Sequence, residues 1–321
     1  MSRDELRIAV FGSSTIAVPV FDAIAQRHRV VLAAISEAAT VRHGRLVPNP
    51  VQEWADARSV PVVNGAVLTQ DLLSQELDRA RLDVLFLLSY GRLLPGNILD
   101  LPRLGSINLH PSPLPWYRGA APIERQIMEG CTRSAVSIIR MSTRLDRGEL
   151  LAQEAFDIHP YDYRADVEAS IIRVGTPLAL RVIDDLARDA VVPLPQVGNG
   201  SYAHKLKPED ELIDWSQSVA AVFNLVRALA PEPAASTFDG TQRVRVTRAQ
   251  PLPADVPLPS TDAVPGYVAV FDRKRADVRC GDGWLELFQL QFPGKTPMST
   301  VDLLNGRRLA PGLLFRNTPS S

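Results

Sequence analysis

Three polar side chains in this sequence are spaced so that they could stabilise charge and move a proton together. Asn108 and His110 flank the apolar Leu109 at the end of a short apolar run, residues 106–109. If this run is a strand, alternation places Asn108 and His110 on the same side of the chain. An amide donates a hydrogen bond at any pH, and an imidazole can donate one or accept a proton.

A stiff loop follows this strand. Pro111, Pro113 and Pro115 fix the backbone and end any helix or regular ladder there. Residues 119–122, Gly-Ala-Ala-Pro, then allow close backbone packing before a helix expected over residues 123–128. Catalytic and binding residues often lie on such loops, held by a rigid scaffold.

Asp146 is the third member of the group. It follows an apolar strand expected over residues 135–141 and lies in a turn closed by Gly148. A carboxylate in that turn could orient the imidazole of His110 and hold its charge. Taken alone, Asn-x-His is more typical of a polar pair that stabilises a fold. A Ser/His/Asp hydrolase would use Ser106 or Ser112, but no Gly-x-Ser-x-Gly turn supports that chemistry.

The elements around these residues predict an α/β fold. Strands expected at 6–11, 30–35, 60–63 and 82–89 alternate with helices at 17–27, 50–58 and 72–80, whereas residues 37–50 are expected to form an irregular loop. This order indicates a doubly wound, mostly parallel, Rossmann-like sheet. Ligands bind such sheets at the carboxyl ends of the strands. Gly12-Ser13-Ser14 lacks the glycine pattern of a dinucleotide site.

A second domain is predicted after residue 200. A helix expected over 166–190, kinked or split at 175–177, leads to a glycine-containing linker at 196–206. We therefore expect domains at residues 1–200 and 201–321. The second begins with a helix over 218–229, capped by Ser216 or Asp214. Short alternating segments beyond it indicate a small antiparallel, OB-like β-barrel.

Bulk properties exclude several classes of protein. The 321 residues have a formal net charge of −1, which argues against a chain that coats nucleic acid non-specifically. There is no run of about 18 apolar residues, and the N-terminus lacks a signal-peptide core. Two distant cysteines predict neither a disulfide framework nor a zinc site. We expect a cytoplasmic, metal-free monomer without membrane contact.

The motifs resemble, in order and spacing, those of the formyltransferase family that uses 10-formyltetrahydrofolate. The matching runs are Asn108-Leu109-His110, Leu114-Pro115-Trp116-Tyr117-Arg118-Gly119-Ala120-Ala121-Pro122 and Leu145-Asp146-Arg147-Gly148. Further runs in the second half, at 202–206, 213–216, 226–228 and 281–283, resemble the second domain of the members that act on methionyl-tRNA. The resemblance therefore covers nearly the whole chain.

The resemblance implies a formyl transfer through a tetrahedral carbon. Asn108 and His110 would stabilise the developing oxyanion, and Asp146 would orient His110 and help to move the proton. It also implies contacts with 10-formyltetrahydrofolate, with backbone contacts to the pterin ring from the loop 89–95. The residues concerned are Tyr90, Gly91, Leu93, Leu94, Ser112 and Pro113.

The acceptor implied by the resemblance is initiator methionyl-tRNA. The cations expected to contact it are Arg42, Arg45, Arg118, Arg243, Arg245, Arg273 and Lys274. For any one barrel residue among them, a solvated surface charge is an equally good interpretation. A short loop after the second strand favours an alternative, a formyltransferase of the same mechanism that acts on a small amine such as hydroxyornithine or an amino sugar nucleotide. A catalytically silent folate- or RNA-binding module is a third hypothesis, opposed by the complete Asn/His/Asp group.

Overall fold

The computed structural model describes residues 5–42, 45–65, 70–253, 256, 262–271 and 273–319. Its contacts divide the chain into two compact units. The first comprises Met1–Pro122, Arg133–Asp157 and Glu168–His204. The second comprises Ile123–Thr132, Ile158–Val167 and Lys205–Ser321, so two short segments from the first half of the chain belong to it.

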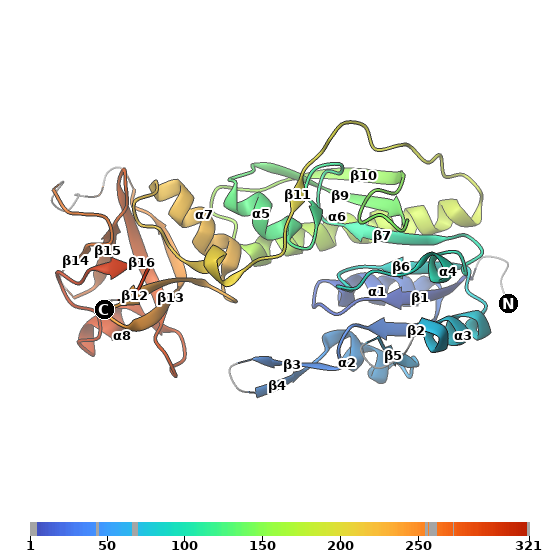
Figure 1. The fold of residues 1–321 in the computed structure, drawn as a ribbon, viewed down its shortest axis with the longest axis horizontal. Coiled ribbons are helices and arrows are strands. Elements are labelled where there is room, and N and C mark those ends of the chain that lie inside the picture. Colours follow the sequence, from blue (N-terminus) through green and yellow to red (C-terminus); the bar gives the residue numbers. More distant parts are fainter. Residues whose placement is uncertain are drawn as a thin grey trace. The chain divides into compact units, whose positions relative to one another are not determined.

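The first unit is built on a seven-stranded sheet (Figure 1). In sheet order the strands are β10 (Leu150–Asp157), β9 (Arg133–Arg140), β7 (Ser106–His110), β6 (Val84–Leu87), β1 (Arg7–Phe11), β2 (Arg29–Ile35) and β5 (Val62–Asn64). The five strands from β7 to β5 are parallel, and β9 and β10 add antiparallel pairs at one edge. The predicted doubly wound, mostly parallel sheet is confirmed.

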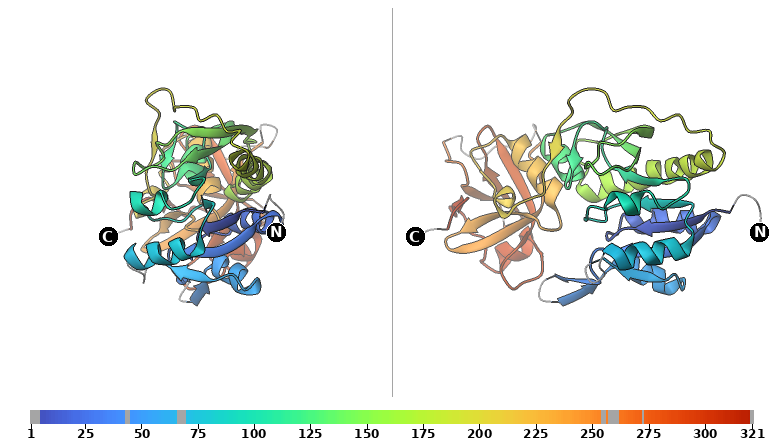
Figure 2. Two further views of the ribbon diagram at one scale, coloured as in Figure 1. Left: turned by 90° about the vertical axis from the view of Figure 1, so that its right-hand side faces the viewer. Right: turned by 45° about the vertical axis from the view of Figure 1, so that its right-hand side comes forward.

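Helices cover this sheet and bury its apolar strands, as continuous apolar runs such as Val84–Leu87 require. They are α1 (Ala17–Arg27), α2 (Pro50–Ala57), α3 (Gln70–Ala80), α4 (Gly96–Leu99) and α6 (Arg164–Ala187). The helix α6 continues through Pro177 and is not split there. It lies along the strands (Figure 2), so close that a Cβ at Gly175 would be 3.0 Å from Leu109 Cδ1.

Residues 39–42 and 45–48 form two paired strands and not part of the irregular loop expected from the sequence over residues 37–50. The strands β3 (Ala39–Arg42) and β4 (Arg45–Pro48) pair antiparallel, with Thr40 opposite Val47. The β-branched Thr40, Val41 and Val47 favour extended backbone at these positions, which accounts for the difference.

The second unit contains an antiparallel sheet. Its strands are β14 (Val268–Phe271), β15 (Arg275–Arg279), β16 (Trp284–Gln291), β13 (Gln242–Pro251), β12 (Ala235–Asp239) and β18 (Phe315–Arg316), in that order, with β17 (Met298–Ser299) paired to β16. A bridge between Tyr267 and Leu314 joins the two ends of the order. The sheet therefore curls back on itself, and the predicted small barrel is confirmed.

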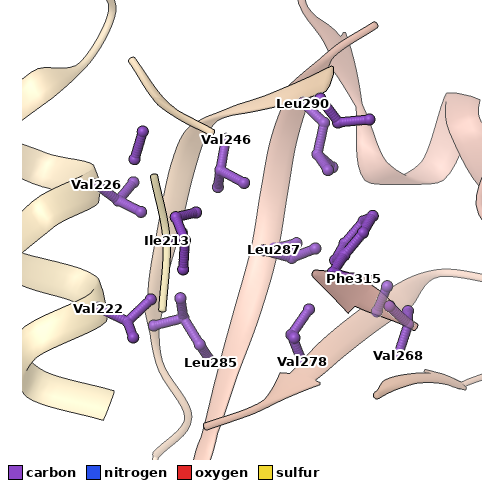
Figure 3. Packing of buried hydrophobic residues seen from close by; sticks show 14 of the residues in the cluster. Ile213, Val222, Val226, Val246, Val268, Val278, Leu285, Leu287, Leu290 and Phe315 are labelled. Atoms are coloured by element: carbon purple, nitrogen blue, oxygen red, sulfur yellow. The ribbon is translucent and has the colours of Figure 1, made fainter. Parts of the chain in front are cut away.

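Aliphatic side chains fill the interior of this barrel, and helix α7 (Val219–Leu229) closes one side of it (Figure 3). Val222 and Val226 point from the helix toward the strands, where Leu285 and Leu287 lie. The helix begins at Ser218, whose hydroxyl accepts a hydrogen bond from the Ala221 N–H. The expected cap, Ser216 or Asp214, was therefore wrong by a few residues.

Short helical segments complete the described elements: α5 (Pro122–Met128), the 3₁₀ helix Pro208–Glu211 and α8 (Thr300–Asn305).

Candidate active site

Asn108, His110 and Asp146 lie together in the first unit. The Nδ2 of Asn108 donates a hydrogen bond to Asp146 Oδ1 at 3.4 Å, and His110 Nδ1 lies 3.7 Å from Asp146 Oδ2. All three side chains are largely buried. The alternation predicted for β7 is the reason that both Asn108 and His110 reach the same carboxylate.

The tautomer of His110 follows from its second contact. Its Nε2 is 2.9 Å from the carbonyl oxygen of Tyr117. Because a carbonyl oxygen only accepts hydrogen bonds, Nε2 carries a proton in this arrangement. The nitrogen that can take up a further proton is therefore Nδ1, which faces Asp146.

The turn that contains Asp146 has an unusual backbone. Asp146 itself has φ +51°, in the left-handed region, where Asp is better tolerated than most residues. Gly148 approaches β9 so closely that a Cβ there would be 1.6 Å from the Arg140 carbonyl oxygen. This close approach folds the loop 141–149 back over β7, and glycine is required to permit it.

Backbone from a distant segment completes the surroundings of the carboxylate. The N–H of Gly119, in the short strand β8 (Arg118–Gly119), donates to Asp146 Oδ2 at 2.8 Å. The strand β8 pairs in parallel with β11 (Tyr202–Ala203), part of the segment that the sequence predicted to be a linker. A Cβ at Gly119, whose φ is +118°, would be 2.6 Å from the Ala203 carbonyl oxygen. The segment thus belongs to the site's framework.

The loop expected to contact folate lies beside Asn108. Leu87, the last residue of β6, pairs with Asn108 across the sheet. In the loop that follows, the Tyr90 side chain is buried against Phe11 and Leu94 is buried, whereas Leu93 is 72% exposed. Gly91 has open space where a side chain would be. A flat ring could therefore approach the backbone here, so the loop fits a pterin; these contacts remain a prediction.

The side chain of Ser112, which was expected to contact the cofactor, bonds the protein's own backbone. It is fully buried, and its hydroxyl donates to the Trp116 carbonyl at 2.7 Å. Its own carbonyl oxygen accepts from the Ser137 hydroxyl at 2.6 Å. The Ser112 hydroxyl therefore fixes the proline-rich loop, and Pro113, which is only partly buried, remains the more accessible of the two residues expected near the cofactor.

Arg118, expected to contact the acceptor RNA, is instead buried inside the first unit. It is 3% exposed, and its guanidinium donates to Gln196 Oε1 and to the carbonyl oxygens of Asp146 and Asn199. All of these donors are directed at acceptors of the protein itself, and a contact of Arg118 with RNA stays a prediction. Beside Arg118 and Gln196 lies an open cavity of about 260 Å³, which is also lined by Arg144 and Arg147.

The other cations predicted to contact RNA differ in whether their side chains are paired within the protein or exposed. Arg243 donates to Glu211 Oε2 at 2.7 Å, and Arg245 lies 3.4 Å from Gln291 Oε1. Arg273 and Lys274 are exposed at the turn between β14 and β15. The side chains of Arg42 and Arg45 lie outside the described residues. A role in RNA contact stays a prediction for all of them.

Comparison with known proteins identifies the family. Residues 6–183 match the formyl transferase family, and residues 205–308 match the formyl transferase C-terminal domain. The chain therefore belongs to the formyl transferase family. A methionyl-tRNA formyltransferase of Thermus thermophilus is 34% identical over 308 residues, which is 96% of this chain and 98% of that relative.

Solved structures share the fold. HypX from Aquifex aeolicus in complex with tetrahydrofolic acid superposes with a TM-score of 0.66 at 17% identity, covering 96% of this chain. This chain spans about half of HypX, 48% of its length. An N-formyltransferase from Helicobacter canadensis, in complex with folinic acid and dTDP-3-aminofucose, gives a TM-score of 0.65 at 15% identity, with coverage of 88% and 98%.

The part of the chain that the structure describes contains neither a helix that could span a membrane nor a group of side chains that could bind a metal ion. None of its described helices is long and apolar enough to cross a membrane. Among the same described residues, no group of three His, Cys, Asp or Glu side chains could hold a metal ion.

Proposed function

We propose that this chain transfers the formyl group of 10-formyltetrahydrofolate to the amino group of initiator methionyl-tRNA. The observation that supports this most strongly is the extent of the similarity. The match to a methionyl-tRNA formyltransferase covers 98% of that relative and includes the barrel of the second unit. An N-formyltransferase in complex with an amino sugar nucleotide also covers 88% of this chain, but at 15% identity, so the 34% identity to the methionyl-tRNA formyltransferase favours tRNA as the acceptor.

The geometry of the first unit suits this reaction. Attack of an amine on a formyl carbon creates negative charge on the formyl oxygen and leaves a proton to be removed from the nitrogen. The amide of Asn108 can donate to that oxygen. The Nδ1 of His110 can take up the proton, and the carboxylate of Asp146 beside it stabilises the imidazolium that results. The proton then leaves with the folate nitrogen.

The loop expected to hold the folate begins next to the catalytic group, at the carboxyl end of β6. The loop 88–95 follows β6, and Asn108 lies opposite the last residue of that strand. A folate held by the backbone of Gly91 and its neighbours would therefore lie next to the catalytic group. The folate supplies the formyl carbon; the chain supplies its orientation and the polar groups around it.

The test is a transfer assay with competing acceptors. Radiolabelled 10-formyltetrahydrofolate is mixed with charged initiator tRNA and a panel of free amines, including hydroxyornithine and amino sugar nucleotides. We expect label on the tRNA alone, and its loss in His110→Ala and Asp146→Ala. Label on a free amine, with the tRNA inert, would assign the chain to small-molecule formylation and reject the proposed acceptor. Undiminished transfer in both variants would reject the proposed site.

A further inference from the structure

The turn that holds Asp146 needs support from outside itself. Asp146 has a left-handed backbone, and its carboxylate must point at both Asn108 and His110. Gly148 permits this conformation but does not enforce it, because glycine is compatible with many others. A catalytic carboxylate must be held within about 0.5 Å of its productive position. The groups that bond the backbone of the turn are therefore of interest.

Gln196 bonds this backbone directly. Its Nε2 donates to the carbonyl oxygen of Asp146 and to that of Gly148, each at 2.8 Å. One side-chain amide thus joins the carbonyl oxygens of two residues in the turn. Gln196 itself is fixed by the chain around it, because Leu194 pairs with Leu150 at the start of β10.

Arg118 holds the other end of the same amide. Its Nε and Nη2 donate to Gln196 Oε1 at 3.1 and 2.7 Å, and its Nε also lies 3.2 Å from the Asp146 carbonyl oxygen. Its Nη1 donates to the Asn199 carbonyl oxygen at 3.2 Å. Both guanidinium donors converge on the one amide oxygen of Gln196, so Arg118 fixes the position of that oxygen with a rigid, planar group.

We infer that Gln196 and Arg118 form a clamp that positions Asp146 for formyl transfer. Neither side chain needs to touch a substrate for this role; each acts through the turn that it holds. The inference rests on the proposed function, since it assigns the clamp's effect to Asp146 in that reaction. It also gives the buried Arg118 side chain a role within the first unit.

A positioning role and a substrate-contact role predict different kinetics. If the clamp positions Asp146, its loss lowers kcat and leaves the KM for tRNA and for folate unchanged. Loss of supporting contacts around a functional group commonly costs about 10- to 100-fold in activity. If Arg118 or Gln196 bound the acceptor, its loss would mainly raise the KM for tRNA.

Two variants of Gln196 and one control variant test the clamp. Gln196→Met removes both its donors and its acceptor at similar length. Gln196→Glu keeps an acceptor for Arg118 but replaces the donor with an oxygen that repels the two carbonyl oxygens. Arg7→Met is the control, because Arg7 also donates to a backbone carbonyl, that of Ala80, but lies at the amino end of β1, whereas the site lies at the carboxyl end of β7. We expect both Gln196 variants to lose kcat by about 10- to 100-fold, and the control to keep it.

A double-mutant cycle then tests whether Gln196 acts through Asp146. In an Asp146→Ala background, Gln196→Met should cause no further loss of kcat, because the group that the clamp positions is gone. Multiplication of the two separate losses would show an independent role and overturn the inference, as would a change confined to the KM for tRNA. If the wild type formylated a free amine and not the tRNA, the proposed acceptor would be wrong. The same cycle measured on that amine would still decide the inference.

Hydrogen exchange gives a readout that does not depend on activity. In the free protein, Gln196→Met should increase amide exchange in residues 144–149, as measured by mass spectrometry, whereas Arg7→Met should not. Increased exchange in this turn together with the loss of kcat supports the clamp. Unchanged exchange in the turn would overturn it, whatever the kinetics showed.

Discussion

Two aspartates, one in each unit, are buried in contrasting ways. Asp146 accepts hydrogen bonds from the Gly119 N–H and the Asn108 amide, and it lies beside an imidazole. Asp277, in β15, is fully buried, with the Arg275 guanidinium 3.1 Å from its Oδ2 and Glu286 opposite it on β16. The carboxylate of Asp146 accepts hydrogen bonds from donors that point at it, whereas the carboxylate of Asp277 lies near a second acid, Glu286.

The two aspartates differ in the groups that surround them, and these groups decide whether the ionised carboxylate is favoured. Burial raises the pKa of Asp277 to about 6, with Glu286 adding to the rise and Arg275 opposing it. Such a group lowers stability when it is ionised. Around Asp146, donors from three separate segments converge on one carboxylate and its turn, as expected of a functional group whose position must be fixed. Burial of an acid is therefore not enough to indicate an active site; the directed partners are.

The largest expected effect that tests the contrast between Asp146 and Asp277 is the loss of catalysis when the charge of Asp146 is removed. Asp146→Asn keeps the size of the side chain but removes its negative charge. We expect kcat for formyl transfer to fall by about 10²–10⁴-fold, because the imidazolium of His110 loses its counter-charge. Asp277→Asn is the matched control and should leave kcat unchanged at temperatures well below unfolding. Equal losses in the two variants would contradict the distinction.

A second effect concerns the packing of the barrel. Leu287 is 1% exposed within the apolar cluster of the second unit. Leu287→Ala should lower the free energy of unfolding by about 2–5 kcal/mol, because it removes buried apolar atoms and leaves a cavity. Urea denaturation measures this loss. A change below about 1 kcal/mol would mean that the barrel interior collapses around the smaller side chain.

A third effect is the pH dependence that Asp277 adds to stability. The pKa of Asp277 is about 6 in the folded protein, whereas its usual value is 3.8. Between these two pH values the folded protein therefore binds more protons than the unfolded chain. The contribution to the free energy of unfolding is therefore favourable at low pH and is lost as pH rises through 6. At about 1.4 kcal/mol per pH unit, the loss approaches about 3 kcal/mol.

Asp277→Asn should remove this contribution. Urea denaturation of both proteins between pH 4 and pH 7 measures it. We expect the stability of the wild type relative to the variant to decline over that range. Parallel curves would show that Asp277 ionises in the folded barrel as it does in the unfolded chain.

The smallest effect concerns single surface cations. Arg273 and Lys274 are exposed, whereas Arg243 is paired with Glu211. If the exposed pair contacts tRNA phosphates, each substitution by Ala should reduce the salt dependence of tRNA binding by about one counter-ion. Arg243→Ala serves as the comparison and should change the slope less. An unchanged slope in the Arg273 and Lys274 variants would place their charges outside the tRNA contact.

Local patterns in the sequence were sufficient to predict the framework. Alternating apolar strands and amphipathic helices predicted the parallel sheet, because periodicity is a property of neighbouring residues. The same alternation predicted that Asn108 and His110 share a side, and both reach Asp146. The strands β3 and β4 were missed because each is only four residues long and each carries an arginine, so their alternation is too short to predict.

Only the tertiary structure revealed what holds the site. Gln196 and Arg118 are 78 positions apart, and no local pattern marks a hydrogen bond over that distance. The Gly119 N–H was invisible to the sequence for the same reason, since every residue but proline has such a donor. Burial likewise decided which arginines face inward, as Arg118 does. The sequence by itself determined which side chains can do the chemistry, because that depends on residue type and short spacing; the tertiary structure decided which distant groups fix them, because that depends on where the chain folds back on itself.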